Sequence, residues 1–389
     1  MTTPDRRAFL RVGSLAGAAA LAAACAPTTT TPPSPPAGGA PAPGAPAPAA
    51  PSWQKEWDDT VTAAKKEGKL VVVTSVGASY REAVGEFQKA YPDIQVEHTS
   101  LNASAFAPKV VTEQKGGVFN YDVATSTYGS LPTALLPVDG LAPIKPLFLR
   151  GDVLDNAVWS DGFEGGWKDT AKQYGYAPFV TRSRHFWVNT DLVKDGDIKN
   201  IDDIINPRWR GKVLALDPRS TGGYQPALNM RLSYGDEIIK KLWKDQEAVL
   251  IRDLRQVTEM MIRGSYALGI SAPIEFVFSE FQAQGVGKNL KHLEIDGVEN
   301  ISGGSEVLFY FPKAPHPNAS KVFVNWIMTK EGSDAWSKQV QSNSRRKDVP
   351  VHAAENVPTP GKKYPVIDRQ EMEPERAKTM DMAKQVLGV

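Results

Sequence analysis

Three apolar runs in the first third of the chain decide the fold: Lys69 to Ser75 reads KLVVVTS, Ile94 to His98 reads IQVEH, and Tyr121 to Thr127 reads YDVATST. Between them, apolar residues recur at helical spacing, and Ser79 to Glu82 is typical of a capping box that opens a helix. Strands that alternate with helices form a mainly parallel sheet covered by helices. We therefore expect an α/β fold that begins near Trp53.

The same alternation returns later in the chain. Further strands are predicted within RHFWVNTDLV (Arg184 to Val193), in KVLAL before Asp217, in YALGIS (Tyr266 to Ser271) and in EVLFYFP (Glu306 to Pro312). Long helical stretches are expected from Tyr224 to Gly264. Because 389 residues exceed one ordinary core, two lobes are expected.

The first 25 residues have the pattern of an export signal. Asp5 to Cys25 reads DRRAFLRVGSLAGAAALAAAC: paired arginines, an uncharged stretch too short to span a bilayer well, and small residues before the only cysteine. It resembles a bacterial signal ending in a lipobox, with Ala22 where such boxes usually have Leu. Arg6 to Leu10 resembles a twin-arginine motif, and the general secretory route is the alternative. We expect Cys25 to carry the lipid of a lipoprotein anchored outside the cytoplasmic membrane. A cleaved signal with an incidental cysteine is the alternative.

Residues 26–52 are nearly all Pro, Ala, Thr, Ser and Gly, which cannot bury a core. This composition predicts a disordered tether between the lipid anchor and the folded part.

Composition and motifs argue against several functions. The net charge of +1 does not suggest a nucleic-acid partner, and one cysteine leaves no Cys-based zinc or redox motif. The G-x-S-x-G, HExxH and Walker A motifs do not occur, and the five histidines have no metal-ligand spacing. The sequence therefore favours a protein without catalytic residues, metal or cofactor.

Six stretches in this order resemble the bacterial extracellular solute-binding proteins of ABC importers, in the branch that binds ferric iron, phosphonates and organic anions. They are Trp57 to Ser75, Phe87 to Glu97, Tyr121 to Thr127, WVNTDLV (Trp187 to Val193), WRGKVLALDPRSTGG (Trp209 to Gly223), and Ala314 to Trp336 with its PHPN and TKEG segments. The resemblance covers nearly everything after the tether.

The resemblance implies a type II periplasmic-binding-protein fold, in which two α/β lobes close on a solute and present it to a permease. On this basis residues 53–183 and 305–340 form the first lobe, and residues 184–304 and 341–389 form the second.

Ligands of open α/β sheets bind beyond the carboxyl ends of the strands, where helix N-termini offer unpaired N–H groups. The loops predicted there are rich in Ser, Thr and Gly, as in DPRSTGGYQ (Asp217 to Gln225). Arg219 offers a fork of donors, hydroxyls add hydrogen bonds, and glycines let a ligand approach the backbone. Asp217 is either a helix cap or the partner of Arg219. The predicted ligand-binding residues are Thr74, Ser75, Gly77, Ser126, Thr127, Tyr128, Arg219, Ser220, Thr221, Gly222, Gly223, Tyr224 and Glu275.

The sequence therefore predicts capture of a small organic anion, a carboxylate, phosphonate or phosphate. Ferric iron is an alternative, although iron-binding relatives use adjacent tyrosines and Tyr224 has no tyrosine neighbour in sequence. A surface-tethered hydrolase acting on an anionic metabolite is a further alternative.

Overall fold

The computed structural model describes residues 52–220 and 223–388, so the export signal, Cys25 and almost all of the predicted tether lie outside the described residues. No helix within the described ranges is long and apolar enough to cross a bilayer.

The first lobe is built on a sheet with the strand order β11, β3, β1, β2. Strands β1, β2 and β3 run parallel, whereas β11 is antiparallel to β3. The four strands are β1 (Lys69–Thr74), β2 (Gln95–Ser100), β3 (Val123–Ser126) and β11 (Val307–Tyr310). The helices are α1 (Gln54–Glu67), α2 (Ala78–Ala90), α3 (Ala103–Lys115), α4 (Ser130–Leu135), α5 (Gly151–Leu154), α10 (Pro317–Trp326) and α11 (Lys330–Val340).

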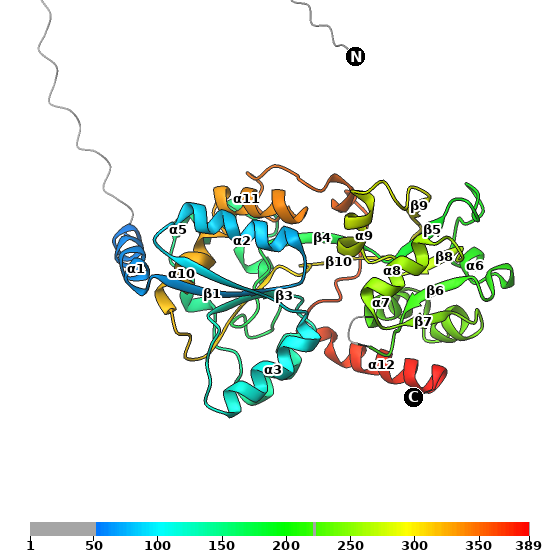
Figure 1. The fold of residues 1–389 in the computed structure, drawn as a ribbon, viewed down its shortest axis with the longest axis horizontal. Coiled ribbons are helices and arrows are strands. Elements are labelled where there is room, and N and C mark those ends of the chain that lie inside the picture. Colours follow the sequence, from blue (N-terminus) through cyan, green and yellow to red (C-terminus); the bar gives the residue numbers. More distant parts are fainter. Residues whose placement is uncertain (1–51, 221–222, 389) are drawn as a thin grey trace, which may run out of the picture. The chain divides into compact units, whose positions relative to one another are not determined.

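Alternation along β1 explains how both faces of this sheet are covered. Leu70 and Val72 belong to the core that includes Phe87 of α2, whereas Val71 and Val73 pack in a separate core with Phe106 of α3. Figure 1 shows α2 and α11 on one side of β1 and α3 on the other. An apolar run without alternation therefore becomes a strand buried on both faces, as expected for a parallel sheet.

The second lobe is built on a sheet with the order β7, β6, β8, β5, β9. Strand β6 is parallel to β7 and β8, and β5 is antiparallel to β8 and β9. The strands are β5 (Phe186–Asn189), β6 (Val213–Leu216), β7 (Val249–Ile251), β8 (Leu268–Ile270) and β9 (Leu290–His292). The helices are α6 (Ile201–Ile204), α7 (Tyr224–Tyr234), α8 (Leu254–Ile262), α9 (Glu275–Gln282) and α12 (Glu373–Leu387), with a π-helical turn at Lys240–Lys244.

Two sequence predictions are wrong in detail. Strand β7 interrupts the stretch predicted to be helical from Tyr224 to Gly264, because a strand of three residues is too short to display a period of two. Helix α2 begins at Ala78, one residue before the predicted capping box, and no side chain caps it. Ser79 therefore lies inside the first turn, past the position from which a hydroxyl caps.

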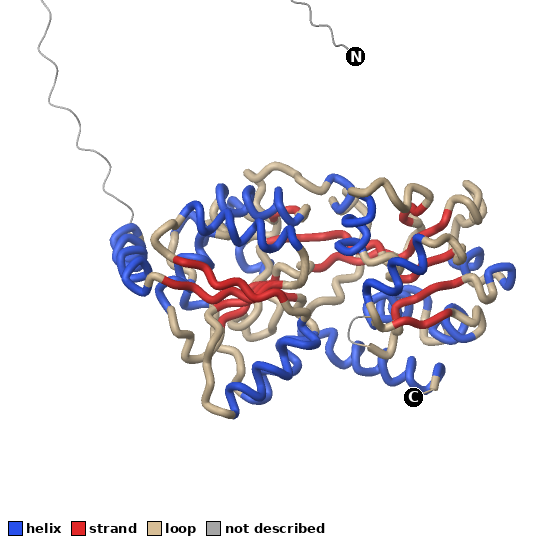
Figure 2. Tube along the Cα trace, viewed as in Figure 1, coloured by secondary structure: helices blue, strands red, loops and turns tan. Residues whose placement is uncertain are grey.

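A small antiparallel sheet connects the lobes. Strand β4 (Phe179–Arg184) leads into β5, and β10 (Glu299–Ser302) leads back toward β11, with β12 (Asn343–Ser344) paired to β4. Figure 2 shows β4 and β10 as strands between the two larger sheets. The polypeptide therefore crosses between the lobes along paired strands.

The chain beyond β12 contacts both lobes. Arg345 donates to the carbonyl oxygens of Ala177 (3.2 Å) and Gly162 (2.9 Å) in the first lobe. Farther on, α12 packs on α7 of the second lobe, where Arg231 Nε donates to the Thr379 hydroxyl at 2.9 Å. The C-terminal segment therefore contacts both lobes. The residue ranges assigned to the two lobes from the sequence stay a prediction.

Candidate functional site

One cavity is lined by elements of both lobes and of the connecting strands. Its volume is about 170 Å³. Its walls come from the β3–α4 loop, β4, the start of α7, the turn after β10 and the C-terminal segment before α12. The lining residues are Thr127, Tyr128, Gly129, Ser183, Tyr224, Gln225, Ser302, Gly304, Ser305, Ile367 and Asp368. We call this space the interlobe cavity.

Three of the predicted ligand-binding residues, Thr127, Tyr128 and Tyr224, line the interlobe cavity. They come from loops that lie at the carboxyl ends of β3 and β6, as the rule for α/β sheets leads one to expect. Of the lining residues that were not predicted, Gly129 and Gln225 lie in the same two βα segments, and the others lie on the connecting strands, in the turn after β10 and in the C-terminal segment.

At the end of β1, the Thr74 side chain is already bonded within the protein. Thr74 is fully buried, and its hydroxyl donates to the Ser75 carbonyl oxygen (2.9 Å) and lies 2.8 Å from Nε2 of His98. Gly77 precedes α2, and Ser75 and Gly77 are partly exposed. None of these residues lines the interlobe cavity.

Arg219 has its donors engaged within the protein. Its Nε and Nη2 donate to the two carboxylate oxygens of Asp217, each at 2.9 Å, and its Nη1 donates to the carbonyl oxygen of Gly388 at 2.8 Å. Burial acts to raise the pKa of Asp217, but hydrogen bonds from Arg219 and Arg252 outweigh it and hold that pKa below its usual value. One of the two predicted roles for Asp217, partner of Arg219, is thereby confirmed. The predicted contact of Arg219 with a ligand stays a prediction.

The rest of this loop forms a tight turn into α7. The Ser220 hydroxyl donates to the Asp217 carbonyl oxygen (2.7 Å) and accepts from the Gly223 N–H (3.1 Å). A Cβ on Gly223 would lie 2.2 Å from that same carbonyl oxygen, so only glycine fits the turn. Thr221, Gly222 and the side chain of Glu275 lie outside the described residues, and Ser126 is a buried residue at the end of β3.

Arg376 of α12 is the residue that sequence reasoning missed. Its side chain is 7% exposed, and its Nη1 donates to the Gly129 carbonyl oxygen (3.2 Å) and to the Thr133 hydroxyl (3.3 Å) of the first lobe. Its Cζ lies 5.5 Å from the ring centroid of Tyr224. Arg376 therefore lies directly behind the wall that Gly129 and Tyr224 form.

The guanidinium of Arg376 lacks a counter-ion. Its Nε and Nη2 are buried and have no hydrogen-bond partner, and no carboxylate among the described residues forms a salt bridge with it. The hydroxyl of Tyr128 is likewise buried and unpartnered. Buried polar groups without partners are rare in folded proteins, and each calls for an explanation such as a ligand. Arg376 lies within the charged segment EPERAK, which contains no motif of a binding site.

The two tyrosines of the cavity are held neutral. Burial raises the pKa of both Tyr128 and Tyr224, and the charge of Arg376 opposes this rise without overcoming it. Both phenols therefore remain hydrogen-bond donors at neutral pH.

A buried ion pair forms another part of the cavity wall. Lys168 Nζ lies 2.9 Å from the Asp368 carboxylate, whose Oδ2 also accepts from the Gly303 N–H at 2.6 Å. Asp368 lines the interlobe cavity, but Lys168 balances its charge. Among the described residues Arg376 has no such ion pair; the Glu373 carboxylate accepts from the Thr133 hydroxyl at 3.4 Å, and that hydroxyl accepts from Arg376 Nη1 at 3.3 Å.

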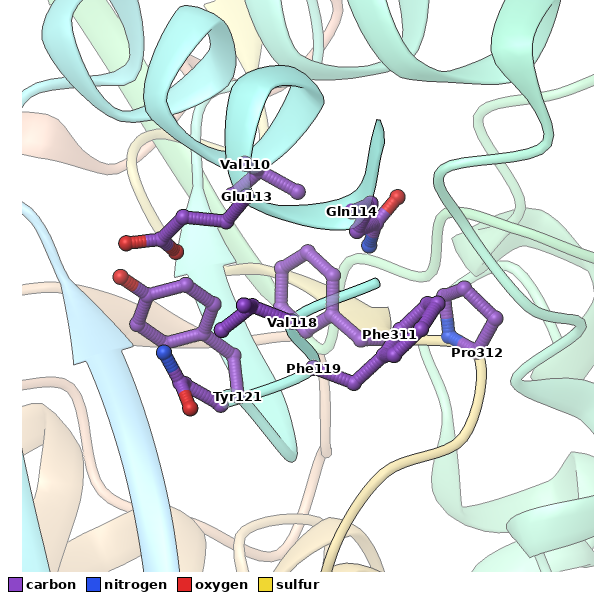
Figure 3. A pocket seen from close by; sticks show the side chains of 9 residues that line it. Val110, Glu113, Gln114, Val118, Phe119, Tyr121, Phe311 and Pro312 are labelled. Atoms are coloured by element: carbon purple, nitrogen blue, oxygen red, sulfur yellow. The ribbon is translucent and has the colours of Figure 1, made fainter. Parts of the chain in front are cut away.

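A crevice in the first lobe offers less. The side chains of Val110, Tyr121 and Phe311 converge in a crevice beside α3 (Figure 3), but this crevice has no space for a molecule the size of water. Within residues 52–220 and 223–388, no group of three or more His, Cys, Asp or Glu side chains is placed to hold a metal ion.

Comparisons with solved structures place the fold among periplasmic binding proteins and confirm the predicted fold class. A substrate-binding protein of an ABC transporter from Agrobacterium tumefaciens superposes with a TM-score of 0.63 at 17% identity, covering 82% of this chain and 94% of that one. AfuA from Actinobacillus pleuropneumoniae, a periplasmic binding protein with bound fructose 6-phosphate, gives 0.59 at 17% identity, covering 83% and 99%. Iron-bound HitA from Pseudomonas aeruginosa gives 0.58 at 16% identity, covering 82% and 99%.

Comparison by sequence gives the family. No curated protein matches the chain. The sequence profile of the family described as bacterial extracellular solute-binding protein matches residues 72–334. This range contains the two larger sheets, except for the first three residues of β1, and most of the residues that line the interlobe cavity. The chain therefore belongs to the bacterial extracellular solute-binding proteins, as its sequence predicted.

Proposed function

We propose that this protein captures a small organic anion in the interlobe cavity and delivers it to the permease of an ABC importer. The observation that carries the proposal is the buried guanidinium of Arg376, which lies behind the cavity wall with two unpartnered donor atoms and no carboxylate. Burying an ion without a partner costs several kcal/mol, a penalty that an incoming anion removes.

The cavity lining supports binding rather than turnover. Thr127, Ser183 and Ser302 contribute hydroxyls, and Tyr128 and Tyr224 contribute neutral phenols. Such groups reject molecules that leave them unpaired once water is excluded. The family and the similar structures are binding proteins rather than enzymes, which also favours capture without chemical change.

The arrangement of Arg376 suggests how binding is coupled to closure. Its helix, α12, packs on the second lobe, while its Nη1 contacts Gly129 of the first lobe. A rotation about β4 and β10 that separates the lobes breaks this contact and opens the cavity. A ligand that bridges both walls stabilises the closed state by its preference for that state.

Delivery fits the features predicted from the sequence. The structure from Agrobacterium tumefaciens is the substrate-binding protein of an ABC transporter, and we assign the same kind of partner to this chain. Acylation of Cys25 after twin-arginine export anchors the protein outside the cytoplasmic membrane, and residues 26–52 let the folded part reach the permease.

Ferric iron is the competing solute, and the similar structure of HitA is iron-bound. In its favour, Tyr128 and Tyr224 line the same cavity although they are far apart in sequence. Against it, burial raises the pKa of both phenols, and a nearby unpaired guanidinium repels a cation. We therefore favour the anion.

Native mass spectrometry of the purified protein, followed by a thermal-shift panel, tests the proposal. The panel contains organic acids, phosphonates, sugar phosphates and ferric salts. A shift with at least one organic anion, and none with its neutral amide or alcohol, is the expected result. A protein that carries no small molecule and responds to none would not be an anion-capturing protein, and a response to ferric salts alone would establish the competing function.

A further inference from the structure

We infer that the interlobe cavity takes up a proton together with its anion, and that this proton binds to the buried carboxyl of Glu306. This inference rests on the proposed function and adds to it a dependence of anion capture on pH.

The carboxyl of Glu306 lies directly behind one wall of the interlobe cavity. Glu306 follows the turn after β10, and two residues of this turn, Gly304 and Ser305, line the cavity. A Cβ on Gly304 would collide with Oε2 of Glu306. Gly304 therefore both lines the cavity and contacts the carboxyl. A charge in the cavity and a charge on Glu306 thus interact mainly through protein rather than through bulk water.

This carboxyl has no cationic partner among the described residues. Glu306 is 4% exposed, forms no salt bridge with them, and accepts a hydrogen bond from the Tyr80 hydroxyl at 2.7 Å. Burial raises the pKa of the carboxyl to about 7, although the Tyr80 hydroxyl and the N–H groups of Ser305 and Glu306 act to lower it. The carboxyl therefore gains or loses its proton close to neutral pH.

Helix α2 brings the Tyr80 hydroxyl to this carboxyl. Burial raises the pKa of Tyr80 well above its usual value, and the charge of Glu306 adds to this rise. Tyr80 therefore stays a neutral donor at neutral pH. Its neighbours Arg81 and Glu82 are exposed, and Trp336 of α11 packs against its ring with the centroids 6.4 Å apart.

The Lys168–Asp368 ion pair lies on another side of the same turn. A Cβ on Gly303 would lie 3.3 Å from Cε of Lys168, and the Gly303 N–H donates to Asp368. The charges of Lys168 and Asp368 balance each other. Glu306 is thus the group of this wall whose titration can follow the charge in the cavity.

An anion in the cavity makes a negative charge on Glu306 less favourable, because like charges raise the pKa of a carboxyl. Protonation of Glu306 strengthens anion binding by the same factor, since the two effects are reciprocal. Well below pH 7 the carboxyl already holds its proton, so affinity does not depend on this group. Above pH 7 binding has to add the proton, and affinity falls as the pH rises. Charges roughly 10 Å apart in an effective dielectric of about 20 give a decrease of about tenfold.

The experiment measures affinity by titration calorimetry from pH 6 to pH 9 on the intact exported chain. The probes are glycerate, tartrate, ethanesulfonate and glucose 6-phosphate, together with any molecule that native mass spectrometry finds on the purified protein. The first three stay ionised over this interval, and the titration of the phosphate itself is the same for every variant. Affinity of the wild type for a bound probe should fall about tenfold. Its binding enthalpy at pH 7.5 should vary with the ionisation enthalpy of the buffer, because a proton is taken up.

Glu306→Gln keeps an oxygen that accepts from Tyr80 but carries no charge, so this decrease and the associated proton uptake should disappear. Glu82→Gln is the matched control, because it removes an exposed carboxylate of the same helix as Tyr80. Its affinity should depend on pH as in the wild type.

A second variant protects the test against loss of folding at position 306. Tyr80→Phe removes a donor that stabilises the charged carboxyl and leaves Glu306 in place. The decrease in affinity should therefore move to higher pH.

Three results would overturn the inference while solute capture stands: the same decrease in Glu306→Gln as in the wild type, a proton uptake that this variant does not change, or a decrease that Tyr80→Phe leaves at the same pH. Absence of binding by every probe, in a protein that also carries no small molecule when purified, would overturn the inference together with the proposed function.

Discussion

The hydroxyl of Tyr224 lies 2.6 Å from the position that a Cβ on Gly129 would occupy. The two residues belong to different lobes, one in the β3–α4 loop and the other at the start of α7, and both line the interlobe cavity. A glycine at position 129 is therefore what lets the lobes meet, since its backbone conformation itself is open to any residue.

Gly129→Ala should act as a wedge between the lobes. The added methyl group forces the Tyr224 side chain to move, which disfavours the closed state by about 1–3 kcal/mol. We expect the affinity for the organic anion identified by the thermal-shift panel to fall about tenfold, measured by titration calorimetry, while the melting temperature without ligand changes little.

The double variant Gly129→Ala with Tyr224→Phe removes the hydroxyl that the methyl group strikes, and it should recover part of the affinity. Gly85→Ala on α2 is the control, since nothing lies within 4 Å of its Cβ position. Equal affinity in Gly129→Ala and wild type would show that the two residues do not meet in the ligand-bound state.

The strands of the first sheet were readable because their signal is local. Val71 to Val73 form an uninterrupted apolar run, and such a run in a βα alternation leaves few alternatives to a buried parallel strand. Strand β7 was not predicted, because three residues are too few to show a periodicity. It is a strand because it pairs with β6. Local patterns thus predicted the fold class, and tertiary pairing decided the elements that they missed.

The site divides in the same way. Ligands of α/β sheets bind beyond the carboxyl ends of the strands, and this rule can be applied to one loop at a time. It predicted three residues that line the cavity: Thr127, Tyr128 and Tyr224. Arg376 could not be found, since its contact with Gly129 spans 247 positions and its own surroundings in sequence are those of an exposed helix. Arg219 donates hydrogen bonds to Asp217, only two residues away. A sequence motif alone does not reveal that donor atoms of Arg219 are already bonded within the protein.

Lys168→Met should destabilise the protein and weaken anion binding together. The variant leaves the Asp368 carboxylate buried without its cation, which costs about 3–5 kcal/mol. It also leaves an uncompensated negative charge on the cavity wall, which repels an anionic solute. Urea unfolding measures the loss of stability, and calorimetric titration with the organic anion identified by the thermal-shift panel measures the loss of affinity.

The double variant Lys168→Met with Asp368→Asn separates these effects, because it removes the charge while keeping an acceptor for the Gly303 N–H. Stability and affinity should both rise relative to the single variant. If affinity stayed low after Asp368 was neutralised, Lys168 would have a role in the site other than balancing that carboxylate.

Cys25→Ala should release the protein from membranes without changing the solute site. Residues 26–52 separate this position from the folded part, so the lost lipid has no effect on the cavity. On fractionation of cells, the variant should appear in the soluble exported fraction instead of the membrane fraction. Its affinity for the organic anion identified by the thermal-shift panel should equal that of the wild type. A variant that stays with the membrane fraction would refute the predicted lipid anchor.

Glu306→Gln should remove a pH dependence from the free energy of unfolding. The Glu306 carboxyl is buried, accepts from the Tyr80 hydroxyl at 2.7 Å, and forms no salt bridge with the described residues. Burial raises its pKa to about 7.

Because the pKa of Glu306 is higher in the folded state than in the unfolded state, its contribution is fully present below the unfolded pKa, near 4.5, and is lost as the pH rises to about 7. In wild type, stability should therefore fall over this interval by on the order of 2–3 kcal/mol from this group. The other carboxyl groups contribute equally to the unfolding free energies of Glu306→Gln and wild type, so their contributions cancel in the difference between the two proteins. Between these two pH values the variant should become more stable relative to the wild type. Urea unfolding at pH 4.5, 6 and 8 measures it, and a constant difference would mean that Glu306 is ionised in the folded protein throughout.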